Sequence, residues 1–111
     1  MINNLTRNTR IASQAKLADD PASRMKGLLG KSELPAQHAL IITRCNSIHM
    51  FFMKFAIDVI FCDGEDRVVG LCRNIKPFHL SPIFFKAHYA IELPSGTILA
   101  TQTQVGDKIQ F

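Results

Sequence analysis

Residues 57–72 of the chain have the sequence IDVIFCDGEDRVVGLC. Its two ends, residues 57–62 and 67–72, are rich in β-branched and other apolar residues, and the acidic segment DGED lies between them at 63–66. β-branched residues favour strands, and an Asp-Gly pair between two such runs is a strong turn signal. The stretch therefore predicts an antiparallel hairpin, which makes a β-rich fold the starting expectation.

Further strands are predicted on both sides of this hairpin. Residues 39–43 form a short apolar run, and residues 88–93 form another that is stopped by Pro94. Runs of this length are typical of strands, and proline does not continue a central strand. One or two strands between residues 5 and 16 and a short one within residues 105–111 are also expected. A helical turn is expected directly after Pro94.

A short helix is predicted over about residues 20–29. Asp20 is a favourable N-cap, and Pro21 suits the first helical position, where its missing N–H group costs nothing. An apolar stripe at helical spacing continues to Leu29, and Gly30 is a typical residue at the end of a helix. The chain thus combines several strands with one or two short helices.

The size and composition of the chain indicate one globular domain over residues 1–111. The chain has 111 residues, of which 47% are hydrophobic and 20% are charged. This length is typical of a single domain, and this composition is typical of a packed core rather than a disordered chain. No internal repeat or linker divides the sequence.

The charge pattern argues against a nucleic-acid partner. Lysine and arginine total 13 against 9 aspartate and glutamate residues, which gives a net charge of +4. The basic residues are scattered singly, without the basic runs or interleaved aromatic residues of nucleic-acid modules. No apolar run approaches the 18 or so residues of a membrane span.

The cysteines predict a reducing compartment. Cys45, Cys62 and Cys72 are odd in number and form no C-x-x-C pair, which favours neither a disulfide framework nor a zinc knuckle. The first residues lack the apolar region of a signal peptide. A cytoplasmic location is therefore expected.

Several motifs along the chain resemble one family. They are RMKGLL at 24–29, IHMFFMKFAIDVIFCD at 48–63, Val68, Pro77, Glu92-Leu93, Gly96 and Gly106-Asp107. In this order and spacing they resemble DUF192, an uncharacterised prokaryotic family of domains of unknown function, over residues 15–111. The resemblance implies a compact α+β domain with a mainly antiparallel, strongly curved, barrel-like sheet and one or two short helices. It implies no established reaction, cofactor or partner.

A polar cluster of Arg24, His49, Met53, Asp58 and Glu92 is the candidate site. Asp58 stands within an apolar strand, so its carboxylate must face solvent or be buried with partners. The family-like position of Arg24 suggests this arginine as that partner, because a guanidinium forks well onto a carboxylate. The pair would either fasten the helix to the sheet or face a ligand. Glu92 and Asp107 lie beside turn sequences, where a carboxylate usually accepts backbone N–H bonds.

Metal binding and covalent catalysis are not predicted. Cys45, His49 and Met53 are soft ligands of the kind that suits Cu(I). Ligands four residues apart share a face only on a helix, however, and strand-like surroundings predict none here. No nucleophile elbow, zincin pair or phosphate loop is present. We therefore assign no metal ligand, cofactor or catalytic residue.

Three functions remain open at this point. The leading hypothesis is a non-enzymatic binding or accessory module, whose pocket would be lined by the five residues of the polar cluster and whose partner is a small molecule or another protein. The first alternative is a small enzyme that uses Asp58 or His49 as its acid–base group. The second is a protein-docking domain that presents the apolar loop from Phe78 to Phe85.

Overall fold

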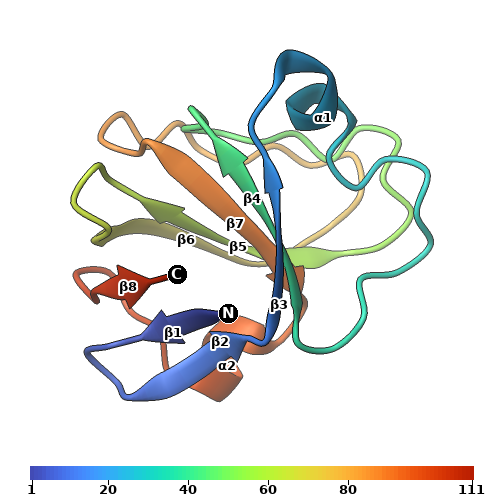
Figure 1. The fold of residues 1–111 in the computed structure, drawn as a ribbon. Helices are drawn as coiled ribbons and strands as arrows, with labels where there is room; N and C mark the ends of the chain where they lie inside the picture. Colours follow the sequence, from blue (N-terminus) through green and yellow to red (C-terminus); the bar gives the residue numbers. More distant parts are fainter.

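Two β-sheets and two short helices make up the chain, and the computed structural model describes all of residues 1–111 (Figure 1). In chain order the elements are β1 (Ile2–Asn4), β2 (Thr9–Ala12), β3 (Gln14–Ala18), α1 (Pro21–Lys26), β4 (His38–Thr43), β5 (Ile57–Cys62), β6 (Val68–Ile75), β7 (Tyr89–Pro94), α2 (Thr97–Thr101) and β8 (Ile109–Gln110). The predicted α+β class is confirmed. Neither helix has the length and apolar character that a membrane crossing requires.

The larger sheet has five strands in the order β3-β4-β7-β5-β6. All neighbouring strands are antiparallel except β3 and β4, which are parallel. The outer strands β3 and β6 do not pair with each other, so the sheet is open. A barrel requires pairing between the first and last strands. The expected strongly curved, barrel-like sheet is therefore not found.

The hairpin prediction is confirmed. Strands β5 and β6 pair antiparallel, with Cys62 opposite Val68, and β6 continues to Ile75. At the turn, the side chain of Asp63 accepts hydrogen bonds from the backbone N–H groups of Glu65 and Arg67, at 2.9 and 3.0 Å. Hydrogen bonds between residues close in the sequence thus define the turn of this hairpin.

The predicted helix is present but shorter than expected. The side chain of Asp20 caps α1 by accepting a hydrogen bond of 2.8 Å from the N–H group of Ser23. The helix ends at Lys26 because Gly27 turns the chain with φ 48° and ψ −123°, a conformation that favours glycine. The turn that follows brings Leu28 into the core.

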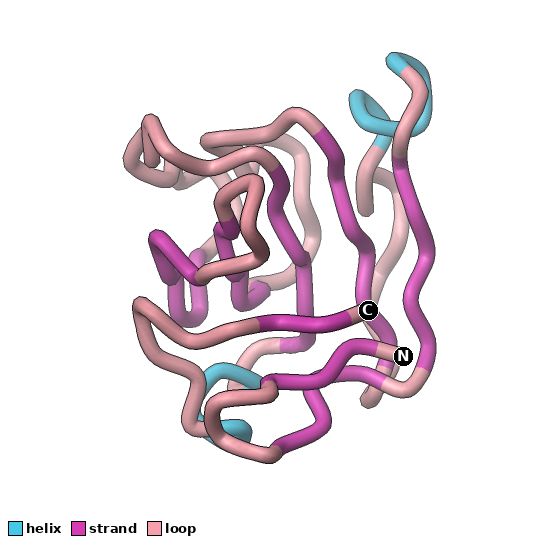
Figure 2. The backbone as a smooth tube through the Cα atoms, turned by 60° about the vertical axis from the view of Figure 1, so that its left-hand side comes forward, coloured by secondary structure: helices cyan, strands magenta, loops and turns pink.

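A small sheet of order β2-β1-β8 covers one face of the large sheet together with α2. Strand β1 pairs with both β2 and β8, which holds the two termini near each other (Figure 2). The other face is covered by α1 and by the long loops around residues 44–56 and 76–88. Between residues 5 and 16, where one or two strands were expected, the chain forms β2 and most of β3, and the additional strand β1 precedes this range.

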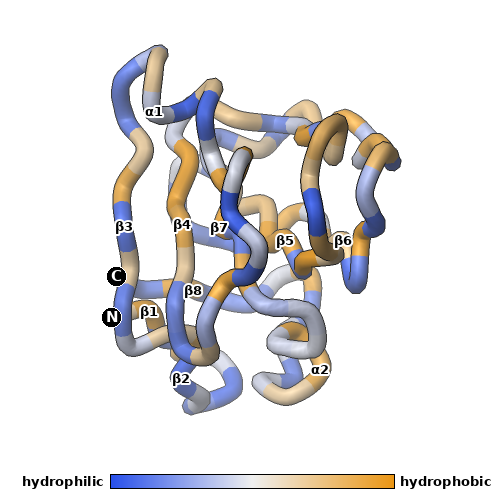
Figure 3. The backbone as a smooth tube through the Cα atoms, turned by 90° about the vertical axis from the view of Figure 1, so that its right-hand side faces the viewer, coloured by the Kyte–Doolittle hydropathy of each residue, from blue (hydrophilic) through white to orange (hydrophobic).

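Alternation along the central strands divides the core into two clusters. Along β7, Ile91 and Leu93 pack toward the small sheet, whereas Ala90 and Glu92 point to the face covered by α1. Strand β4 is largely hydrophobic, while the edge strand β3 alternates with hydrophilic positions (Figure 3). The large sheet therefore separates the side chains on one of its faces from those on the other.

Candidate functional site

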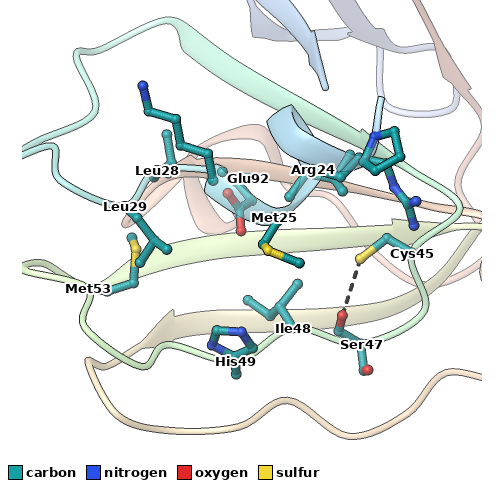
Figure 4. Close-up of a pocket in the computed structure, with 14 residues that line it drawn as sticks. Arg24, Met25, Leu28, Leu29, Cys45, Ser47, Ile48, His49, Met53 and Glu92 are labelled. Atoms are coloured by element: carbon teal, nitrogen blue, oxygen red, sulfur yellow. Dashed lines mark hydrogen bonds between the residues drawn. The ribbon is translucent and has the colours of Figure 1, made fainter. Parts of the chain in front are cut away.

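A pocket of about 360 Å³ lies between α1 with its following turn, the end of β4 and the loop from Cys45 to Met53 (Figure 4). Four of the five residues of the predicted polar cluster line it, and Asp58 does not. The four are Arg24, His49, Met53 and Glu92. The structure thus brings together residues that are up to 68 positions apart in the sequence, from 24 to 92.

Asp58 is separated from the pocket by the large sheet. In the pairing of β5 with β7, Val59 lies opposite Glu92 and Asp58 lies opposite Leu93. Directly opposite residues share a face, and successive residues alternate between faces. Asp58 therefore points to the side of the small sheet, while Glu92 points to the pocket.

Asp58 is satisfied entirely by backbone N–H groups, although it is only 1% exposed. Its Oδ1 accepts a hydrogen bond of 2.8 Å from Asn74, and its Oδ2 accepts bonds of 3.1 Å from Gly96 and 2.8 Å from Ile98. Asn74 lies in β6 and has the irregular backbone angle φ 51°, while Gly96 and Ile98 lie at the start of α2. The carboxylate of Asp58 therefore holds both the irregular part of β6 and the start of α2. This residue fastens two elements to the sheet.

The predicted pairing of Asp58 with Arg24 is wrong. The guanidinium of Arg24 donates from Nε to the carbonyl of Thr43 at 2.8 Å and from Nη2 to the carbonyl of Arg44 at 2.6 Å. These bonds tie α1 to the end of β4. The prediction failed because helix and carboxylate lie on opposite faces of the sheet, which the spacing of the two residues does not reveal.

Glu92 is the least satisfied polar group of the site. It lies in the central strand β7 and is 6% exposed. Its Oε1 atom has neither solvent contact nor a hydrogen-bond partner, and neither salt bridge of the chain involves it. Burial raises the pKa of Glu92 to about 7. The carboxyl group is therefore poised to change its charge near neutral pH.

The two expected turn carboxylates behave differently. Asp107 accepts a hydrogen bond of 2.9 Å from the N–H group of Gln104, as predicted, and it also binds Asn4 and Arg7. These hydrogen bonds and the guanidinium of Arg7 outweigh the opposing effect of burial and lower the pKa of Asp107. The corresponding prediction for Glu92 is wrong, because its side chain leaves the strand into the pocket before the turn at Ser95 begins.

The soft side chains Cys45, His49 and Met53 all line the pocket, although a strand would have separated them. All three can line it because residues 44–53 form a loop instead of a strand. Cys45 and Met53 nevertheless lie on opposite sides of the pocket in Figure 4. No group of three histidine, cysteine, aspartate or glutamate side chains in the chain is arranged to hold a metal ion.

The other polar groups of the loop are engaged locally. Burial raises the pKa of the Cys45 thiol, and its S–H group donates to the carbonyl of Ser47 at 3.2 Å. The thiol therefore stays protonated near neutral pH and is a poor nucleophile. His49 is exposed, and its ring stacks on Phe51 with the centroids 5.1 Å apart. Its Nδ1 accepts a hydrogen bond from the N–H group of Phe51 at 3.3 Å.

Sequence reasoning missed the apolar half of the pocket. Leu28, Leu29 and Ile48 line it, together with Met25, whose side chain is 81% exposed. The apolar stripe that ends at Leu29 was interpreted only as a helix signal, and Leu28 is its one buried member. Gly27 within this stripe could have indicated the pocket. A glycine can end a helix early, and a shorter helix leaves part of the sheet beneath the helix uncovered.

Comparisons with known proteins support the resemblance found in the sequence. The chain is 36% identical over 117 aligned residues to the UPF0127 protein of Pyrococcus horikoshii, covering all of this chain and 98% of the relative. It is 38% identical to the UPF0127 protein of Thermococcus kodakarensis, again over all of this chain and 73% of the relative.

Two crystal structures share the fold. One is a protein of unknown function from Novosphingobium aromaticivorans, with a TM-score of 0.80 and 23% identity over 87% of this chain and 74% of that one. The other is described as a putative transcription regulator from Sinorhizobium meliloti, with a TM-score of 0.75 and 20% identity over 86% and 79% of the two chains. Residues 3–111 match the model of DUF192, described as "Uncharacterized ACR". The chain therefore belongs to the DUF192 family of uncharacterised proteins.

Proposed function

We propose that this domain is a binding module that holds a small, mainly apolar molecule in the pocket beneath α1. The observation that carries the proposal is the buried carboxyl group of Glu92, which lines the pocket (Figure 4) and whose Oε1 has no hydrogen-bond partner in the chain. A buried polar atom without a hydrogen bond is costly, so such an atom in a pocket indicates a missing partner. The volume of about 360 Å³ is within the range of small-molecule sites.

A binding role fits the pocket better than catalysis. The thiol of Cys45 is held protonated, and the exposed ring of His49 stacks on Phe51 beside no nucleophile. Asp58 is enclosed on the other face of the sheet with its oxygens bound to backbone N–H groups. Of the two acid–base candidates, only His49 therefore reaches the pocket.

The protein-docking alternative rests on exposed side chains in the loop from Phe78 to Phe85. Phe78 is 62% exposed, Leu80 is 65% exposed and Phe85 is 85% exposed. This exposure is what a docking loop needs, but no feature of the loop identifies a partner. The pocket is the better supported site, because it combines a cavity with an unpartnered buried group.

The binding role is tested by mapping where 1-hexanol binds, using amide chemical shifts in NMR spectra. We expect saturable shifts concentrated at α1, the loop of residues 45–53 and strand β7. Ile48→Trp should abolish them by filling the pocket, because Ile48 lines it. The matched control is Ile83→Trp, since Ile83 is 54% exposed and lies outside the pocket. Shifts centred on the loop from Phe78 to Phe85, or unaffected by Ile48→Trp, would contradict the proposal.

A further inference from the structure

The Glu92 carboxyl group stands at the floor of the pocket with apolar neighbours on both sides. Across the sheet its strand neighbours are Leu40 and Val59. Above it the chain passes at Gly27, where a β-carbon would lie 3.8 Å from Oε1. With glycine at this position no side chain covers the carboxyl group from above, and Glu92 is among the residues that line the cavity. None of these neighbours offers Glu92 a hydrogen-bond donor from its side chain.

Two of the other polar side chains around the cavity are held by backbone carbonyl groups. The guanidinium of Arg24 is held on the carbonyls of Thr43 and Arg44, and the thiol of Cys45 is held on Ser47. Oε1 of Glu92 is thus the one buried side-chain nitrogen or oxygen atom in the protein that has no hydrogen-bond partner. Arg24 and Lys26 line the same cavity, but neither donates a hydrogen bond to Oε1 of Glu92, so a ligand that carries a donor would complete the site.

Seven of the 14 residues that line the cavity are hydrophobic, and several of them have flexible side chains. Met25 and Met53 contribute flexible thioether side chains, and Leu29 and Ile48 contribute aliphatic ones. Methionine side chains adapt to irregular apolar shapes. The volume of about 360 Å³ corresponds to roughly a dozen water-sized groups, which is room for a short alkyl chain.

We infer that the pocket takes a small primary amine with an apolar chain, whose ammonium group donates a hydrogen bond to the carboxylate of Glu92. The inference rests on the proposed binding function and names the chemical class of its ligand. A buried carboxylate is stabilised most by a partner of opposite charge, and charge-assisted hydrogen bonds are about twice as strong as neutral ones. An alcohol would make the weaker bond, and a carboxylate ligand would repel the ionised group.

The inferred contact predicts a pH dependence. Burial raises the pKa of Glu92 to about 7, so the Glu92 carboxyl group of the ligand-free protein becomes ionised as the pH rises through that value. An ammonium ligand binds the ionised form, so its affinity should increase about tenfold from pH 6 to pH 8. The charged and titratable groups facing Glu92 are Arg24 and Lys26 from α1 and Cys45 and His49 from the loop. Glu92→Gln removes the titrating carboxyl group and should therefore abolish this pH profile.

Calorimetric titration with three probes of equal chain length, hexylamine, 1-hexanol and hexanoate, tests the inference at pH 8. We expect hexylamine to bind most tightly. Glu92→Gln should weaken hexylamine by at least about tenfold, as expected for one charge-assisted hydrogen bond, and should change 1-hexanol by less than about threefold. Glu65→Gln removes the same charge at an exposed position outside the pocket and should leave all three affinities unchanged.

The outcomes separate this inference from the proposed function. If 1-hexanol or hexanoate binds and Ile48→Trp abolishes it, but hexylamine has no advantage or is insensitive to Glu92→Gln, the amine inference is wrong and the binding function stands. Binding of hexylamine that is unchanged between pH 6 and pH 8 would also overturn the inference. If none of the three probes binds the wild-type protein at millimolar concentration, both the inference and the proposed function fail.

Discussion

Replacing Glu92 by glutamine should change the pH dependence of folding stability. Burial raises the pKa of this carboxyl group from 4.5 to about 7 in the folded protein. Between these values the folded protein keeps a proton that the unfolded chain releases. This retained proton makes the free energy of unfolding depend on pH. Its stabilising contribution to the folded protein is fully present below about pH 4.5 and is lost as the pH rises through 7.

The size of the effect follows from the shift. A difference of about 2.5 pKa units at about 1.4 kcal/mol each amounts to about 3–4 kcal/mol over the whole range. Most of it, about 2–3 kcal/mol, falls between pH 5 and pH 8. Glutamine has nearly the same shape and does not titrate, so the variant should lack this part of the pH dependence.

Urea unfolding of the wild type and of Glu92→Gln at pH 5, 6, 7 and 8 measures the effect directly. The free energy of unfolding of the wild type, relative to the variant, should fall by about 2–3 kcal/mol from pH 5 to pH 8. Glu65→Gln, at an exposed position, should show no such trend. A difference between wild type and Glu92→Gln that stays constant within about 0.5 kcal/mol would refute a buried, unpaired carboxyl group at this position.

Three further outcomes are expected from the structure. Asp58→Ala leaves three backbone N–H groups without hydrogen-bond partners and should lower the free energy of unfolding by about 3–5 kcal/mol in denaturant unfolding. A loss below about 1 kcal/mol would contradict the hydrogen-bond network. Arg24 binds other partners on the opposite face of the sheet. The losses in free energy of unfolding caused by Arg24→Ala and Asp58→Ala should therefore add within about 0.5 kcal/mol in a double-mutant cycle. A larger coupling energy would indicate that the two residues do interact. Gly70→Ala places a β-carbon 2.3 Å from the ring of Phe84 and should cost about 1–3 kcal/mol, which Phe84→Leu should partly recover if the clash is the cause.

Elemental analysis of the purified protein should find no stoichiometric transition metal, because Cys45 and Met53 face each other across the pocket instead of converging (Figure 4). About one copper per chain, lost in His49→Ala, would overturn this expectation.

The local elements could be predicted from the sequence because their signals act within a few residues. The hairpin of β5 and β6 follows from β-branched runs around a turn in which Asp63 binds its own backbone. The start of α1 follows from Asp20, whose side chain caps the helix three residues on. Family membership follows from motifs of this local kind, and it is confirmed over residues 3–111.

The composition of the site depended on tertiary structure. All six residues of β5 are buried, so its sequence shows no alternation of polar and apolar faces that would orient Asp58. Only the register with β7 decides that Asp58 and Glu92 point to opposite faces. The parallel pairing of β3 with β4 and the open sheet likewise depend on contacts between distant segments.

The sequence by itself determined the fold class, the family, the hairpin, the capped helix and four of the residues that line the pocket. Only the tertiary structure decided that these four meet, that Asp58 holds α2 and β6 on the other side of the sheet, and that Glu92 lacks a partner. The physical reason is that turns and caps form from neighbouring residues, whereas the face of a buried strand and the partners of a buried carboxyl group are set by register and packing across the whole chain.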